Sequence, residues 1–203
     1  HERLADAQKR VADFAADDPQ RLAELACDAA PQQFHILFAV LASSPEHRAA
    51  AAAVFRTVVQ QLPGNKLTTA ERIRLGKRTA GAAIALLRLG DRVSACHVFQ
   101  DAEDPEALTQ FVHRAKDRGV KPEELADWLG QSTEGRTRFA ILLTLGEFAM
   151  DEIPPSRRSL LTRQLVTWYG DDPSSAIHGA VGWVLRNWGL AEPAAQVDRT
   201  AVP

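Results

Sequence analysis

Four dipeptides of the type Asp-Pro or Ser-Pro recur along the chain, and each is a typical start of an α-helix. They lie at positions 18/19, 44/45, 104/105 and 172/173. The Asp or Ser side chain can accept a hydrogen bond from a backbone N–H of the first turn, and proline suits the first helical position because its missing N–H has no partner there. Between these starts the apolar residues recur at steps of three and four. The sequence therefore predicts an all-α fold.

The stretch after Asp171 carries the signals of one complete helix. Asp172 is the predicted N-cap, Pro173 the first helical residue, and Gly189 a left-handed C-cap. One face is apolar, formed by Ile177, Val181, Val184, Leu185 and Trp188. Glycine costs a helix about 1 kcal/mol relative to alanine. Because Gly179 and Gly182 both lie in this helix, we expect a neighbouring helix to approach closely there.

The predicted helices form pairs, and some of the pairs resemble one another. Residues 85–91 (ALLRLGD) are similar to residues 141–147 (ILLTLGE). Helix pairs of roughly 30 to 45 residues that cannot bury their apolar faces alone are typical of an α-solenoid. We expect an irregular solenoid of antiparallel helix pairs over residues 1–189, beginning with a helix at 2–16; a compact helical bundle is the alternative. Residues 190–203 hold two prolines and little pattern, which predicts a linker or tail.

Several motifs also carry a family resemblance. They are AIALLRLG at 83–90, LLTLGEF at 142–148, WYGDDP at 168–173, and Ile177-His178 followed by WVLRNWG at 183–189. With these motifs the chain, from about Ala12 to Gly189, resembles the HEAT-like helical region of large bacterial multidomain proteins. In those proteins a serine/threonine kinase-like domain often precedes the region and a formylglycine-generating-enzyme-like (sulfatase-modifying) domain follows it. The resemblance implies a HEAT-like solenoid that neighbours enzyme domains and is not itself an enzyme.

Composition limits the possible partners and location. The formal net charge of −2 gives no general attraction to nucleic acids or anionic membranes. Cys27 and Cys96 have no CxxC spacing, so neither a disulfide framework nor a zinc site is indicated, and a reducing cytoplasm is expected. No apolar run approaches the roughly 18 residues needed to cross a bilayer. Because the chain begins with His1, we expect it to be a piece of a larger protein.

Three groups of residues have side chains that could take part in chemistry or contact a partner. His178 lies two turns before Arg186 with Asp171 and Asp172 at the foot of the helix, so it could belong to an acid/base pocket or simply bond a neighbouring backbone group. Trp188 could pack in the core or, if exposed, contact a partner. Cys96, His97 and His113 do not have the spacing of a zinc site. We therefore predict no catalytic residue, no metal and no cofactor.

A basic cluster is the strongest charge feature. It comprises Lys66, Arg72, Arg74, Lys77 and Arg78. These side chains could bind phosphate or a nucleic-acid backbone, or they could form a solvated helix face. Arg157 and Arg158 lie at a predicted helix start, where the positive end of the dipole disfavours them, so either an acidic partner or a nearby carboxylate is expected there.

The sequence thus favours a noncatalytic helical-repeat module that acts as a scaffold, spacer or regulatory segment. Its expected partner is another protein or a neighbouring domain of the same chain, with no membrane contact. Two alternatives remain open: a nucleic-acid-binding HEAT fold that uses the basic cluster, and a small-ligand pocket around His178 and Trp183. Lys66, Arg72, Arg74, Lys77, Arg78, His178 and Trp188 are the candidate contact residues.

Overall fold

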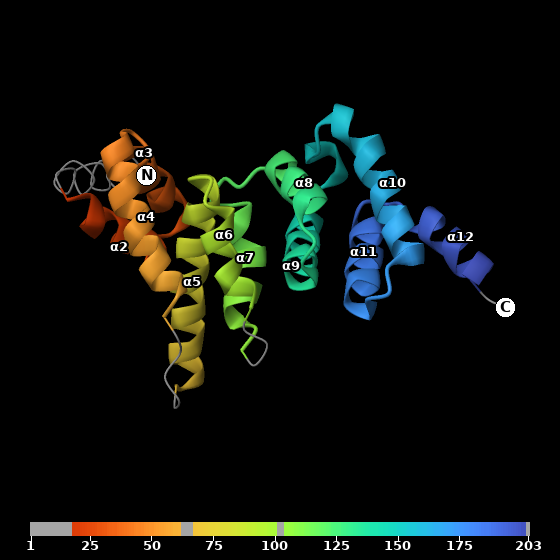
Figure 1. The fold of residues 1–203 in the computed structure, drawn as a ribbon, viewed down its shortest axis with the longest axis horizontal. Helices are drawn as coiled ribbons and strands as arrows, with labels where there is room; N and C mark the ends of the chain where they lie inside the picture. Colours follow the sequence, from red (N-terminus) through yellow and green to blue (C-terminus); the bar gives the residue numbers. More distant parts are fainter. Residues whose placement is uncertain (1–17, 62–66, 101–103, 202–203) are drawn as a thin grey trace. The chain divides into compact units, whose positions relative to one another are not determined.

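A computed structural model of the chain describes residues 18–61, 67–100 and 104–201, and this part is helical throughout, without a strand (Figure 1). The predicted all-α class is confirmed for these residues. The predicted helix at 2–16 lies outside them. The chain divides into two compact units, unit 1 (His1–Val120) and unit 2 (Lys121–Pro203). The single domain over 1–189 stays a prediction.

Unit 1 is built around one long helix, α5. Its described helices are α2 (Pro19–Asp28), α3 (Pro31–Leu41), α4 (Pro45–Val59), α5 (Thr69–Arg88), α6 (Arg92–Ala95), the 3-10 helix η1 (Cys96–Phe99) and α7 (Glu106–Ala115). Helix α5 lies between α4 and α7 and also contacts α2 (Figure 1). Every residue from Thr79 to Leu87 is buried, whereas residues 69–74 are exposed. The second half of α5 is therefore the core of unit 1, and its first half extends into solvent.

Three predicted helix starts of unit 1 are confirmed in their side-chain contacts, whereas α7 begins at Glu106 and its N-cap, Pro105, makes no side-chain bond. The Asp18 carboxylate accepts a hydrogen bond from the Arg21 N–H at 2.9 Å, and the Ser44 hydroxyl accepts one from the His47 N–H at 3.1 Å. Thr68 and Glu71 form the expected capping box, in which each side chain bonds the backbone N–H of the other. These local bonds define where α2, α4 and α5 begin.

Arg118 follows the C-terminal end of α7 and forms hydrogen bonds with the C-terminal end of α2. Its guanidinium is fully buried and donates to the carbonyl oxygens of Ala26 (3.2 Å), Cys27 (3.3 Å) and Ala29. These carbonyls lie at the C-terminal end of α2, where backbone acceptors lack partners within the helix and the dipole favours a cation. Burial, and secondarily the charge of Arg114, lowers the pKa of Arg118 to about 10, so it remains charged at neutral pH.

Gly81 makes room for this contact. A Cβ atom at Gly81 would lie 2.1 Å from the Cys27 carbonyl oxygen and 2.7 Å from an Arg118 guanidinium nitrogen. Only glycine lets α5 approach the end of α2 this closely. The ring of Phe34 covers the Arg118 guanidinium at 4.6 Å from its centroid, which completes the enclosure.

Unit 2 consists of α8 (Pro122–Gln131), α9 (Gly135–Gly146), the 3-10 helix η2 (Met150–Glu152), α10 (Pro155–Asp171), α11 (Ser175–Asn187) and α12 (Ala191–Ala201). Helix α11 contacts α9, α10 and α12 (Figure 1). Its apolar face is buried as predicted, through Ile177, Val181, Val184, Leu185 and Trp188. A Cβ atom at Gly182 would lie 2.9 Å from the Tyr169 ring, which confirms close approach there, whereas the space at Gly179 is open.

The start of α11 and the nature of the tail differ from the sequence predictions. Helix α11 is capped by Ser174, whose hydroxyl accepts from the Ile177 N–H at 3.4 Å, and not by Asp172. The reason is that α10 continues through Asp171, while the Asp172 carboxylate bonds Arg138 and the Ser174 N–H. Residues 191–201 form α12 instead of an unpatterned linker, because Pro193 falls in the first turn, where its missing N–H has little effect. The left-handed C-cap at Gly189 is confirmed by its φ of 72°.

Candidate functional site

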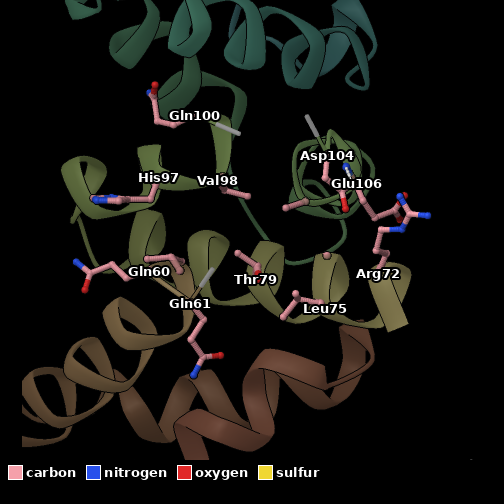
Figure 2. Close-up of a pocket in the computed structure, with 13 residues that line it drawn as sticks. Gln60, Gln61, Arg72, Leu75, Thr79, His97, Val98, Gln100, Asp104 and Glu106 are labelled. Atoms are coloured by element: carbon pink, nitrogen blue, oxygen red, sulfur yellow. Dashed lines mark hydrogen bonds between the residues drawn. The ribbon is translucent and has the colours of Figure 1, made fainter. Parts of the chain in front are cut away.

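A cavity of about 590 Å³ lies in unit 1, where the end of α4, the middle of α5, η1 and the start of α7 meet (Figure 2). Its lining residues are Val59, Gln60, Gln61, Arg72, Leu75, Gly76, Thr79, His97, Val98, Gln100, Asp104, Glu106 and Ala107. A Cβ atom at Gly76 would lie 2.6 Å from the Glu106 side chain, so glycine at this position lets α7 begin against α5.

The cavity has an apolar floor and a polar rim. Figure 2 shows Leu75, Thr79 and Val98 directed toward its interior, whereas the side chains of Gln60 and Gln100 extend away at the edge. Arg72, Asp104 and Glu106 occupy the opposite side of the rim. This arrangement matches the general anatomy of binding interfaces, in which an apolar centre is surrounded by polar groups.

The polar groups of the rim differ in the hydrogen bonds and ion pairs that they already form within the protein. The Asp104 carboxylate accepts from the Glu106 N–H at 3.0 Å, and the Glu106 carboxylate accepts from the Gln110 amide at 2.8 Å. Within the described part of the chain, the Arg72 guanidinium has no ion-pair partner. His97 Nδ1 lies 3.1 Å from the Ser94 carbonyl oxygen, a geometry in which this nitrogen donates to the carbonyl. The rim therefore offers both donors and acceptors.

The basic cluster does not act as one unit. Arg72 lines the cavity, Arg74 and Lys77 are exposed, and Arg78 forms an ion pair with Asp28. Lys66 lies outside the described residues. The described lining of the cavity holds no Phe, Tyr or Trp, the side chains on which the bases of single-stranded nucleic acids commonly stack.

The two candidates on α11 have structural contacts. His178 Nδ1 lies 2.8 Å from the Tyr169 carbonyl oxygen, and its ring stacks on the Tyr169 ring with centroids 4.1 Å apart. This is the backbone bond that one interpretation expected. Trp188 does not offer the exposed surface that a partner contact required, because it is buried and its indole N–H donates to the Phe148 carbonyl oxygen at 2.9 Å. Trp183 packs against Gly146, where a Cβ atom would lie 1.9 Å from its ring.

Other charged residues pair within unit 2. Arg157 bonds the carboxylate of Asp127, which confirms the carboxylate expected near the start of α10. Arg158 donates to the Asp151 and Ile153 carbonyl oxygens. Arg138 stacks on Trp168, 3.9 Å from a ring centroid, and pairs with Asp172 at 2.8 Å. Asp172 thus joins α9 to the α10–α11 connection and is not available for an acid/base pair with His178.

No metal-binding group occurs in the part of the chain that the structure describes: no three His, Cys, Asp or Glu side chains gather closely enough there. Over the same residues no helix is both long and apolar enough to cross a membrane. Comparison of the chain with protein family models, with curated proteins and with solved structures finds no match.

Cys27 is an inert core thiol. It is fully buried, its Sγ–H donates to the Ala23 carbonyl oxygen at 3.3 Å, and burial raises its pKa from 9.0 to about 12. Because the folded pKa is the higher one, the stabilising contribution of the protonated thiol is complete below about pH 9 and is lost as the pH rises toward 12. Reactive thiols need an exposed, easily formed thiolate.

We therefore expect Cys27 to resist labelling in the folded protein. In a Cys96→Ser variant at pH 8, reaction with a disulfide reagent is expected to be at least about a hundredfold slower in buffer than in urea, because labelling requires local or global opening. The matched Cys27→Ala variant, which keeps only the half-buried Cys96, is expected to react faster in buffer. Equal rates for the two variants would contradict the burial of Cys27.

Proposed function

We propose that this chain is a noncatalytic helical-repeat module of the HEAT-like type that binds a segment of a protein partner or of a neighbouring domain. The observation that carries the proposal is the cavity of unit 1, with its apolar floor at Leu75, Thr79 and Val98. A floor of this kind accepts an apolar side chain, and the rim can bond the polar backbone on either side of it. Side chains that fill such pockets supply most of the binding energy of protein interfaces.

A protein partner is favoured over the other candidates. Nucleic-acid binding draws on clustered cations and aromatic stacking, whereas the rim carries one arginine beside the carboxylates of Asp104 and Glu106. Amide side chains such as Gln60 and Gln100 can both donate and accept, which suits the alternating groups of a peptide backbone. The proposed location is the cytoplasm, where cysteines such as Cys27 and Cys96 stay in the thiol form.

The proposal is tested by filling the cavity. Ala107 lines the cavity, so Ala107→Phe is expected to place a ring in it. Peptides selected on the wild-type chain, from a phage-displayed library of random sequences about twelve residues long, are the probe. We expect at least one selected family to contain an apolar anchor and to bind Ala107→Phe at least about tenfold more weakly by calorimetry.

The control is the same substitution at Ala39, which is exposed on α3 and does not line the cavity. Ala39→Phe is expected to bind the selected peptides like the wild type. The proposed function fails if no peptide family is enriched, or if every family binds Ala107→Phe and Ala39→Phe equally well.

A further inference from the structure

The first half of α5 has a second unoccupied face, which we call the basic face and define as Ala70, Ile73, Arg74 and Lys77. These residues are spaced at i, i+3, i+4 and i+7 and therefore share one side of the helix. Gly76 and Thr79, which border the cavity, lie on the other side. All four residues of the basic face are exposed. The face is thus separate from the cavity.

The cations of this face form no ion pair with a described residue. Arg78, one residue beyond, forms an ion pair with Asp28 of α2, whereas no described carboxylate lies within ion-pair distance of Arg74 or Lys77. Glu71, the acidic residue of the same turn, bonds the Thr68 N–H in the capping box, and this bond and, to a smaller extent, the charge of Arg74 lower its pKa. The face therefore presents two exposed cations without a described ion pair, beside an apolar side chain.

Ile73 makes the face suited to a protein partner. Its side chain is 36% exposed, one of the few large apolar side chains so exposed among the described residues. A nucleic acid would pair with the two cations but would leave the isoleucine without an apolar contact, and so few phosphate contacts give weak, salt-sensitive binding. A protein segment can satisfy both features, because it can present carboxylates around an apolar residue.

We propose that the basic face binds an acidic peptide segment that places an apolar side chain on Ile73 and carboxylates on Arg74 and Lys77. This inference rests on the proposed function, since it assigns the module a second protein contact and names its chemistry. The complementary charges orient the peptide and speed its association with the basic face, and the contact with Ile73 buries apolar surface.

The test uses the same phage-displayed peptides with a charge-reversed chain, Arg74→Glu/Lys77→Glu. We expect a peptide family rich in Asp and Glu around one apolar residue, binding this variant about tenfold more weakly than the wild type. Its binding to the wild type is expected to weaken in about 0.5 M salt, where exposed charges are screened. It is expected to bind Ala107→Phe unchanged, which separates the basic face from the cavity.

The charge-matched control is Arg21→Glu/Arg163→Glu, which makes the same change in net charge at two exposed arginines on α2 and α10. This variant is expected to bind the acidic family like the wild type. If only cavity-binding families are enriched, the basic-face inference is overturned while the proposed function stands; if no family is enriched, both are overturned. Tighter binding of single-stranded or duplex DNA than of any acidic peptide, lost in Arg74→Glu/Lys77→Glu, would also overturn it.

Discussion

Replacing Arg118 by methionine is expected to lower the free energy of unfolding of unit 1 by about 3 kcal/mol. Methionine fills much of the same volume but cannot donate to the carbonyl oxygens of Ala26, Cys27 and Ala29, which would stay buried without partners. Each unsatisfied buried acceptor costs about 1–3 kcal/mol, and part of that cost is offset because a buried charge is removed.

The two units can be followed separately in this experiment. All four tryptophans belong to unit 2, so their fluorescence follows that unit alone, whereas circular dichroism follows the helices of both. We expect urea titrations of Arg118→Met to shift the transition seen by circular dichroism. Arg163→Met, at an exposed site on α10, is the matched control and is expected to change stability by less than about 0.5 kcal/mol.

A lysine variant distinguishes charge from hydrogen bonding at this position. Arg118→Lys keeps the charge at the end of α2, but a single ammonium cannot reproduce the planar fork that serves three carbonyls. Its stability is expected to lie between those of the wild type and Arg118→Met. Wild-type stability of Arg118→Met would show that the carbonyls at the end of α2 do not depend on this side chain.

The second large effect is expected at Gly81. In most helices Gly→Ala gains up to about 1 kcal/mol, but here the new methyl group would lie 2.1 Å from the Cys27 carbonyl oxygen, a backbone atom that cannot rotate away. Helices α2 and α5 must then separate, which also displaces Arg118 from its acceptors. We expect Gly81→Ala to destabilise unit 1 by about 2–4 kcal/mol in the same urea titration.

Gly179→Ala provides the matched comparison. Gly179 also lies inside a helix, and a Cβ atom there would meet nothing within 4 Å. The same substitution is therefore expected to stabilise unit 2 slightly, by up to about 1 kcal/mol, as seen by tryptophan fluorescence. If Gly81→Ala also stabilised the protein, the close approach of α5 to the end of α2 would be wrong.

Local signals predicted the helices well where a second residue marked the start. Ser44 is followed by Pro45 and Thr68 by Glu71 three residues later, and each caps the predicted helix. Near residue 172 two candidate caps, Asp172 and Ser174, lie two positions apart. The choice between them depends on Arg138, which draws the Asp172 carboxylate into an ion pair from 34 residues away. The residues around position 172 alone do not show that Arg138 will bond the Asp172 carboxylate.

The candidate site could not be predicted for the same reason. Its floor joins Leu75 and Thr79 of α5 to Val98 of η1, and its rim adds Gln60 and Glu106 from two other helices. None of these residues belongs to a motif, and among the lining residues only Arg72 was a candidate contact residue, through its charge. The sequence around Arg118 is a polar stretch ending in glycine, typical of a solvated turn, so its burial follows only from the packing of α2, α5 and α7.

The large sequence separation between Arg118 and its hydrogen-bond acceptors has a consequence for folding during synthesis of the chain. The acceptors of Arg118 precede it in the sequence by 89 to 92 residues. The ribosome therefore synthesises all of α2 to α5 before it adds Arg118, the residue whose side chain bonds the carbonyl oxygens at the end of α2. Until then the carbonyls at the end of α2 need water as their partner, and the surfaces that later enclose Arg118 stay open. We expect unit 1 to reach its final packing only after residue 118 has emerged, late and in one cooperative step.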